Sequence, residues 1–376
     1  MMIRLPVVYR TTISLSKCRR YHSSAPSYTF EKVVSSIPSN VGSKILWCLN
    51  AKDFPLGIKH KQLELVNKVV NFQDITFLIT LVDLVIPQPS TTTSTEILKI
   101  YQDYYYHSLN TYLSRYELNK ENVKVTSTVF KERIVNELPL QLLKNNGNHY
   151  IIGETNSGKT EFTKYLTQLT RKLSKEQYNF KISSQPLTST KNIAIESITN
   201  NWIVVDTPGY ISNEKNGIYG LVNDNDIQSK IEITSNLRSN FEWKKFKIEN
   251  DGSIISINKF FFLKPPTNTE FHYRKFLFGK IKKINDDQFN QFINKKFPRL
   301  SYSKFIIPTF TGSIDIIIEG LGYIEINLPS GDSTNENWEI YIPNGLKCIV
   351  RNSLNDCILE STKSGYQVHY KELAKC

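Results

Sequence analysis

The segment that most constrains the fold of this chain is GETNSGKT, at residues 153–160. It fits the pattern G-x-x-x-x-G-K-[ST], in which a glycine-rich turn closes its backbone N–H groups around phosphate oxygens. The apolar run at residues 149–152 predicts a buried strand before the turn. Apolar residues at helical spacing in residues 162–173 predict a helix after it. Because a phosphate loop must join a strand to a helix, this context favours it over a chance Gly-Lys-Thr in a surface turn.

Specific roles follow for the side chains of this loop. We expect Lys159 to reach the outer phosphates and to contribute to catalysis, and the Thr160 hydroxyl to hold Mg²⁺. The other expected nucleotide contacts of the loop come from Gly153, Asn156, Ser157 and Gly158.

A second phosphate element is predicted at residues 202–209, WIVVDTPG. The apolar residues indicate a buried strand, and Asp206 at its end is placed to bind Mg²⁺ through water. The Gly209 amide is placed to contact the terminal phosphate, so this turn would sense whether that phosphate is present and would contribute to catalysis. Asp-Thr-Pro-Gly also suits a plain β-turn, but its position behind an apolar strand favours the functional interpretation.

The element that reads the base is expected upstream of the phosphate loop. In GTP-binding domains it is Asn-Lys-x-Asp, and the Asn-Lys pair at residues 258–259 is followed by two phenylalanines instead of an acid. Upstream, a buried strand ends in TLVD, whose last residue, Asp83, offers the carboxylate that guanine requires. The segment VTST at residues 125–128 is the expected companion loop, with Thr126 and Ser127 beside the base.

Strands alternate with helices through the first two thirds of the chain, which predicts an α/β fold with a doubly wound, mostly parallel sheet. Strands are expected at residues 44–49, 74–80 and 121–128, and helices at residues 61–70 and 96–118. The tyrosine-rich face of the second helix favours core packing over a stacking platform for bases.

Past residue 245 the pattern changes to short β-rich runs separated by Pro and Gly, which predicts a smaller C-terminal domain. The expected division is therefore residues 30–240 for the nucleotide-binding domain and 245–376 for the β-rich domain. Basic and aromatic residues alternate at residues 271–283, which is either a nucleic-acid patch or an ordinary solvated face.

The first 25 residues have the composition of a mitochondrial presequence. They are rich in Arg, Ser and Thr and contain no acid, and Arg19-Arg20-Tyr21 is similar to a matrix-protease cleavage site. A basic tail that touches nucleic acid is the alternative.

Charge and cysteine content narrow the partners. The net charge of +12 is shared between this segment and the rest of the chain, where it is compatible with RNA or an anionic membrane surface. No apolar run reaches the ~20 residues of a spanning helix, so no transmembrane segment is expected. The five cysteines form no C-x-x-C pair, so neither zinc nor a disulfide framework is expected.

Taken together, these stretches are similar to a known class. KDFPLG, TLVD, VTST, GETNSGKT, DTPGY, FFLKPP and WEIYIPNGL resemble the circularly permuted GTPases of the YqeH type, and within them a fungal mitochondrial group named for a genetic interaction with prohibitins. The resemblance covers nearly the whole chain from residue 45. It implies a circularly permuted P-loop GTPase domain followed by a β-rich C-terminal domain.

The resemblance also implies roles for particular residues. Asn156 matches the position that coordinates K⁺ in many relatives, and Thr188 or Ser189 matches the switch residue that closes on Mg²⁺. Tyr210 falls where Ras-like proteins keep a water-positioning Gln, so slow hydrolysis of GTP is expected. The base-reading motif departs from the family pattern, because TLVD lacks its Asn and Lys.

The function implied by the resemblance is a GTP-binding switch of the mitochondrial matrix that assists assembly of the small mitochondrial ribosomal subunit by contacting it or its rRNA. The runner-up is a nucleotide-binding scaffold with little hydrolysis that supports inner-membrane or lipid maintenance alongside prohibitin-linked factors. An ATPase is the third interpretation, disfavoured because Asp83 offers a carboxylate suited to guanine.

Overall fold

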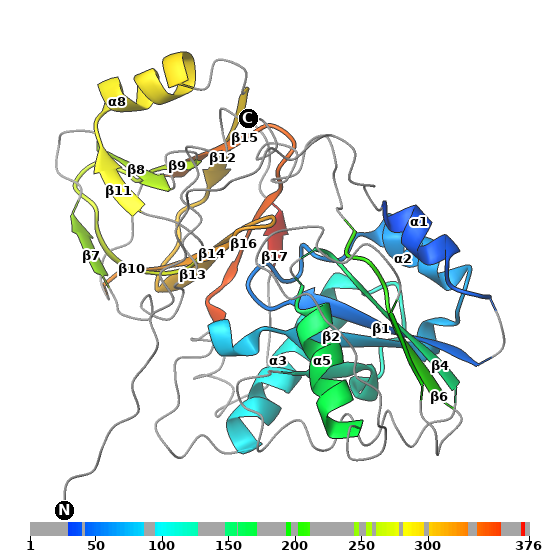
Figure 1. The fold of residues 1–376 in the computed structure, drawn as a ribbon. Helices are drawn as coiled ribbons and strands as arrows, with labels where there is room; N and C mark the ends of the chain where they lie inside the picture. The colour runs from blue at the N-terminus through cyan, green and yellow to red at the C-terminus, as the bar shows by residue number, and fades with distance from the viewer. Residues whose placement is uncertain are drawn as a thin grey trace, which may run out of the picture.

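The protein consists of an α/β part and a β-rich part (Figure 1). The computed structural model describes residues 29–39, 42–85, 95–126, 147–155, 157–170, 193–196, 202–210, 244–247, 253–257, 261–277, 281–296, 301–329, 337–354 and 370–372. We call the described residues up to 210 the N-terminal part and those from 244 the C-terminal part. The segment interpreted as a presequence lies outside these ranges.

The N-terminal part is built on a six-stranded sheet in the order β3-β2-β1-β4-β6-β5. Five of its strands are mutually parallel, and β5 runs antiparallel to β6. The strands are β1 (Ser43–Asn50), β2 (Ile75–Thr80), β3 (Val123–Val125), β4 (Gly147–Gly153), β5 (Ile193–Glu196) and β6 (Trp202–Asp206). This confirms the α/β class and the mostly parallel sheet. The central strands are apolar runs because both faces of the sheet are covered.

Alternate residues of β1 face different layers. Ile45 and Trp47 join a cluster with α1 (Phe30–Ser35), α2 (His60–Asn67) and α3 (Thr95–Tyr112). Leu46 and Cys48 join a second cluster with α5 (Lys159–Thr170), which crosses in front of the sheet in Figure 1. Short helices η1 (Phe72–Asp74), η2 (Val82–Leu84) and η3 (Lys120–Asn122) flank β2 and β3.

The tyrosine-rich face of α3 is core, as expected, with Tyr101, Tyr104 and Tyr105 buried. The helix ends at Tyr112, however, so the prediction that it extends to residue 118 was wrong. The chain after it is held by tertiary hydrogen bonds: the Gln73 side chain donates to the Glu117 carbonyl and accepts from the Asn119 amide. These contacts capture backbone that helical periodicity alone assigns to the helix.

The C-terminal part consists of two antiparallel sheets, which agrees with the β-rich expectation. One has the order β17-β16-β13-β14-β10-β7 and the other β11-β8-β9-β15-β12. Their strands are β7 (Lys244–Lys247), β8 (Ile254–Ile257), β9 (Phe261–Lys264), β10 (Glu270–Leu277), β11 (Ile281–Ile284), β12 (Tyr302–Ile307), β13 (Ser313–Ile318), β14 (Gly322–Asn327), β15 (Trp338–Pro343), β16 (Cys348–Asn352) and β17 (Tyr370–Glu372). The helices α8 (Asp286–Gln291) and η4 (Phe292–Lys296) follow β11.

The basic and aromatic stretch at residues 271–283 supplies strands instead of a stacking surface. Phe271 and Tyr273 on β10 are buried in the core of the C-terminal part. Exposed charge from this stretch lies on β11, an edge strand, where Lys282 and Lys283 face solvent. Lysines are common on sheet edges because they prevent unwanted strand pairing, so the solvated-face alternative describes this stretch better.

The two parts pack against each other. Ile317, Tyr323, Ile349 and Leu354 of the C-terminal part belong to the hydrophobic cluster of the N-terminal sheet. Across the described residues, no helix combines the length and the apolar character needed to cross a membrane.

Candidate nucleotide-binding site

The phosphate loop lies at the carboxyl end of β4 and leads directly into α5, as its sequence context indicated. Gly158 has a φ of +82°, which favours glycine, and a Cβ there would lie 3.3 Å from Thr80 Cβ, so the close neighbour leaves little room for a side chain. This neighbour, Thr80, belongs to the predicted base loop. The loop is therefore wedged against the segment that precedes it in the chain.

Lys159 is buried and folded back over the loop. Its Nζ donates hydrogen bonds of 2.9 Å to the carbonyl oxygens of Gly153 and Glu154. An ammonium has three N–H donors, so these bonds fix its direction and leave one for a phosphate oxygen. Burial lowers the pKa of Lys159, while the carboxylate of Asp206 acts in the opposite direction.

Thr160 and Asp206, the two described residues that were predicted to bind Mg²⁺, contact each other. The Thr160 Oγ1 donates to the Asp206 Oδ2 at 3.2 Å. Within the described residues the Asp206 Oδ1 is buried and has no hydrogen-bond partner. Burial raises the pKa of the Asp206 carboxyl to about 6, against the opposing effects of Lys159 and Thr160. A buried carboxylate oxygen lacking a partner, beside a hydroxyl, fits a hard divalent cation that prefers oxygen ligands.

The DTPG turn lies directly on the phosphate loop. A Cβ on Gly209 would approach the Thr155 Cα at 3.0 Å and the Lys159 Nζ at 3.2 Å. The Thr155 N–H donates to the Tyr210 carbonyl at 2.9 Å. Gly209 therefore lies beside the Lys159 ammonium; the expected contact of its amide with the terminal phosphate stays a prediction.

Tyr210 points away from that surface and into the core. It is fully buried, its hydroxyl accepts a hydrogen bond of 3.1 Å from Trp47 Nε1, and its ring meets that of Phe30 edge-on at 4.8 Å. Burial raises the pKa of the Tyr210 hydroxyl well above its usual range. Tyr210 thus anchors the DTPG turn to the sheet and does not serve as a water-positioning side chain.

On the base side, the TLVD loop follows β2 and adjoins the phosphate loop. The Thr80 hydroxyl lies within hydrogen-bond distance of the carbonyl oxygens of Leu49 and Ser157, at 3.0 and 2.5 Å. Leu81 adopts the left-handed conformation (φ 56°), a strained state for a leucine, and Asp83 is half-buried in η2. Such strain is concentrated at binding sites.

The companion loop is brought to the same place by the pairing of β2 with β3. The buried Thr126 donates its backbone N–H to the Ile79 carbonyl at 2.8 Å. The structure therefore gathers the phosphate loop, Asp206, Gly209, the TLVD loop and Thr126 at one edge of the sheet. The expected site residues Asn156, Ser127, Thr188 and Ser189 lie outside the described residues.

Three contributors were missed by sequence reasoning. Thr80 was seen only as a lost motif residue, although its hydroxyl reaches the phosphate loop. The anchoring role of Tyr210 needs Trp47, which is distant in the chain. The phosphate-loop pattern assigns no role to Glu154, yet its backbone carbonyl accepts a hydrogen bond of 2.9 Å from Lys159 Nζ and so helps to orient that ammonium.

Comparison with known proteins agrees with this geometry. Residues 148–251 match a family model described as "50S ribosome-binding GTPase", and residues 288–375 match one described as "Genetic interactor of prohibitins 3, C-terminal domain". A GTPase domain of this kind implies GTP or GDP as ligand, usually with Mg²⁺.

Individual relatives agree along most of the chain. Proteins named "Genetic interactor of prohibitins 3, mitochondrial" are 27% identical over 89% of this chain in Debaryomyces hansenii and 24% identical over 88% in Candida dubliniensis. The chain spans about three fifths of these relatives, 63% of the first and 59% of the second. The chain is a homologue of the proteins named genetic interactor of prohibitins 3, and it carries both a GTPase domain and a C-terminal domain of their type.

Proposed function

We propose that this chain is a circularly permuted GTPase of mitochondria that acts as a GTP-dependent switch in assembly of the small mitochondrial ribosomal subunit. The observation that carries the proposal is the contact between the TLVD loop and the phosphate loop. Thr80 touches the phosphate loop at Ser157 although it precedes it in the chain. A base loop upstream of the phosphate loop, carried by β2 of the same parallel sheet with β1 between it and β4, is what a permuted order requires.

The strand order supports the permutation. Starting at β4 and reading toward β3, the sheet passes through β1 and β2, so the strands that carry the base and companion loops lie on one side of the phosphate strand. On the other side, β6 carries Asp206 and β5 pairs with it antiparallel. Nucleotide-binding parallel sheets place their ligand at the carboxyl ends of such strands.

Turnover on this site is expected to be slow. Tyr210 is buried beneath the loop, so no side chain at that position orients the attacking water. A K⁺ ion bound at Asn156 is the proposed substitute, because it would add positive charge where charge develops in the transition state. Hydrolysis by the wild type should therefore be faster in KCl than in NaCl, and Asn156→Ala should remove that difference. Equal rates in both salts would contradict the K⁺ site.

The mitochondrial address rests on the acid-free N-terminal segment and on relatives that are named mitochondrial. We expect import into the matrix with removal of roughly the first 20 to 25 residues. Mass spectrometry of the mature N-terminus from isolated mitochondria measures this directly. Recovery of the chain with Met1 intact would argue against a cleaved presequence.

The ribosomal part of the proposal rests on the class resemblance and on the basic net charge. The description of the matching GTPase family, "50S ribosome-binding GTPase", names the other subunit, so an experiment must measure association with both ribosomal subunits. Mitochondrial extract is sedimented with GTP or GDP, followed by crosslinking and sequencing of bound RNA. Cosedimentation with the small subunit or its precursor in GTP only is expected.

A second candidate is a nucleotide-binding scaffold in inner-membrane maintenance. The observations that favour it are the incomplete TLVD motif and the burial of Tyr210, both of which weaken a hydrolytic cycle. The two candidates separate in a deletion strain that expresses Lys159→Ala. Normal small-subunit rRNA with full rescue supports the scaffold, whereas loss of that rRNA supports the switch.

A further inference from the structure

A partly enclosed cavity lies at the amino edge of the N-terminal sheet, the edge opposite the candidate nucleotide site. It measures about 130 Å³, well above the ~10–15 Å³ that one water molecule needs. We call it the amino-edge cavity. Its polar lining includes Lys44, Asp74, Thr76, Glu121, Asn122 and His149. None of the expected nucleotide contacts belongs to this lining, so the proposed function leaves the cavity unexplained.

The sheet brings two of these side chains together at the start of its central strands. Lys44 on β1 and His149 on β4 are register partners. Each precedes by two residues a member of the apolar cluster next to α5, namely Leu46 and Ile151. Because alternate residues of a strand point to the same face, Lys44 and His149 lie on the α5 face of the sheet, on the amino side of that cluster.

Another part of the lining comes from the short helices η1 and η3, which one amide holds together. Asn122 Nδ2 donates to the carbonyl oxygens of Gln73 at 2.9 Å and of Ile75 at 2.7 Å. These two bonds fix η3 against η1 and the start of β2. Asp74 of η1 and Glu121 of η3 are therefore carried by a braced segment of the fold.

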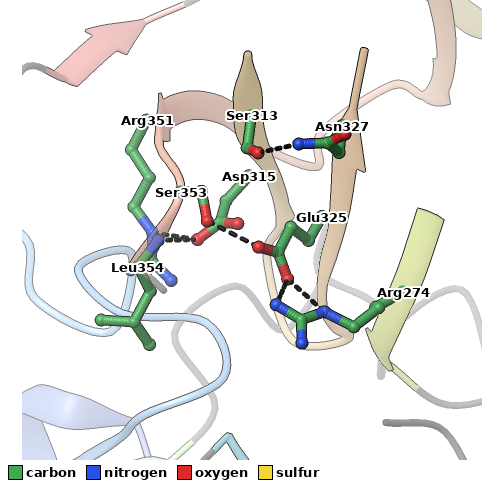
Figure 2. A network of polar contacts seen from close by, with 8 residues as sticks. All are labelled: Arg274, Ser313, Asp315, Glu325, Asn327, Arg351, Ser353 and Leu354. Carbon is green, nitrogen blue, oxygen red and sulfur yellow. Dashed lines mark hydrogen bonds and ion pairs between the residues drawn. The ribbon is translucent and has the colours of Figure 1, made fainter. Parts of the chain in front are cut away.

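The C-terminal part shows how this fold accommodates buried charge (Figure 2). Arg351 and Asp315 form a pair with 2.9 Å between Nε and Oδ2. Glu325 pairs with Arg274, with 2.7 Å between Oε2 and Nη2. Each charged side chain of this network faces an opposite charge, which offsets the cost of removing it from water.

Two half-buried charges of the amino-edge cavity lack such a partner. Among the described residues, neither Lys44 nor Asp74 belongs to an ion pair. Glu121 differs, because its carboxylate is paired with Lys124 at 2.7 Å. The cavity therefore offers one unpaired cation and one unpaired anion, on different elements, and the charge of its lining is balanced.

His149 adds an unsatisfied hydrogen-bonding group. Its side chain is 1% exposed, and neither ring nitrogen has a hydrogen-bond partner within the described part of the chain. Burial and the charge of Lys44 lower the pKa of His149 to about 4, against the opposing effect of the Gly147 carbonyl. The ring is therefore neutral at physiological pH, with one N–H donor and one acceptor. Both nitrogens are covered, so a ligand gains this bond only when the ring turns toward the cavity.

We propose that the amino-edge cavity binds a small zwitterion of amino-acid size. The Lys44 ammonium binds its carboxylate, and the Asp74 carboxylate binds its ammonium group. The His149 ring turns toward the cavity and forms a hydrogen bond with the bound molecule. One ligand thus supplies the partners that these three side chains lack in the folded chain.

The charge of the lining argues against ligands that carry one sign of charge. An inorganic phosphate or a nucleotide would be repelled by the Asp74 carboxylate, and a polyamine by the Lys44 ammonium. A neutral sugar would leave both charges unpaired. A zwitterion satisfies both, and charge-assisted hydrogen bonds are stronger than neutral ones. Because the cavity and the phosphate loop lie at opposite edges of the sheet, this ligand should not compete with GDP.

The test follows the ring signals of His149 by NMR in the full chain labelled with ¹⁵N-histidine. The chain has six histidines, so the spectrum is simple. At mildly acidic pH the His149 ring stays neutral because its pKa is about 4, whereas exposed histidines are largely protonated below their ordinary pKa of 6.5. Glycine, L-alanine and L-serine are the zwitterionic probes. Propionate and ethylammonium each keep one charged group of alanine, and inorganic phosphate is the further probe.

L-Alanine should shift the His149 signals saturably in the wild type. Propionate and ethylammonium should each bind about tenfold more weakly, because each loses one charge-assisted contact. In Lys44→Met, alanine should bind no better than ethylammonium, and in Asp74→Asn no better than propionate. A merely structural role for either residue would leave these preferences unchanged. The matched control is Lys61→Met, at an exposed site on α2, which should bind alanine as the wild type does.

His149 signals that none of the three amino acids shifts would mean that the cavity holds water only, and would overturn the proposal. Equal binding of alanine, propionate and ethylammonium would overturn it as well, and so would tighter binding of phosphate. Displacement of alanine by GDP would place the ligand in the nucleotide site instead. Should Lys44→Met fail to fold, an unchanged preference for alanine over propionate in Asp74→Asn would be sufficient to reject it. A wild type that binds alanine but not GDP would contradict the proposed function alone.

Discussion

The phosphate side of the site has every residue type that its motif requires, whereas the base side has only part of its motif. On the phosphate side the glycine-rich turn, Lys159, Thr160 and Asp206 are all present, and each contacts another part of the site. On the base side Asp83 remains, but Thr80 stands where the family pattern has Asn. Thr80 nevertheless reaches the phosphate loop at Ser157. The base loop therefore contacts the phosphate loop, but its sequence lacks the Asn and Lys of the family motif.

This difference indicates where binding energy comes from. Charge-assisted hydrogen bonds to phosphates are stronger than neutral ones, and they do not depend on the identity of the base. In the proposed site, discrimination of the base would rest on the carboxylate of Asp83. We therefore expect a site whose affinity depends on the phosphate loop and whose selectivity is moderate and rests on Asp83.

The largest expected effect is on the phosphate side. Lys159→Ala should weaken GDP binding about 100-fold or more, because it removes the buried ammonium that we expect to bind the phosphates. Fluorescent GDP titration measures this. Lys164→Ala, an exposed lysine on the same helix, is the matched control and should bind as the wild type does. Equal binding by Lys159→Ala would mean that this loop is not the site.

The next effect concerns Mg²⁺ and pH. Burial raises the pKa of Asp206 from its ordinary 3.8 to about 6 in the folded protein. The protonated acid therefore adds to the stability of the fold. This contribution is complete below about pH 3.8 and is lost as the pH rises through about 6. Mg²⁺ needs the ionised form. Its contribution to GDP affinity should be complete above about pH 7 and fall as the pH drops through 6.

Asp206→Asn should lose about tenfold in Mg²⁺-dependent affinity and should no longer show that pH dependence. Comparing the two proteins in the same buffers cancels the titration of the nucleotide phosphates, which occurs in both. A wild-type profile parallel to that of Asp206→Asn from pH 5 to 8 would show that Asp206 does not serve the cation.

The smallest expected effect tests the link between the two sides. Thr80→Val keeps the shape of the side chain and removes the hydroxyl that lies near the Ser157 and Leu49 carbonyls. A hydrogen bond of this type contributes about 1 kcal/mol, so GDP affinity should fall about fivefold. Thr111→Val, at an exposed helical site, is the control. An unchanged affinity would mean that the base loop does not support the phosphate loop.

The contrast between the phosphate side and the base side also explains which features could be predicted from the sequence. The phosphate loop and Asp206 were predictable because phosphate chemistry dictates those residue types in adjacent positions, and the alternation of strands and helices gave the sheet. The early end of α3 and the roles of Thr80 and Tyr210 were not, because each depends on a contact between distant residues such as Trp47 and Tyr210. The pairing of Lys44 with His149 at the amino-edge cavity is of the same kind.

Guanine recognition by the incomplete TLVD motif is tested most directly by comparing the binding of GDP, xanthosine diphosphate (XDP) and ADP to the wild type and to Asp83→Asn. Bidentate hydrogen bonds between a carboxylate and the guanine N–H groups are costly to lose, so the variant should bind GDP at least about tenfold more weakly and prefer XDP. Asp74→Asn, at the opposite end of β2, is the matched control and should keep the wild-type preference. Equal affinity of the wild type for ADP and GDP, unchanged in Asp83→Asn, would contradict guanine recognition at this site.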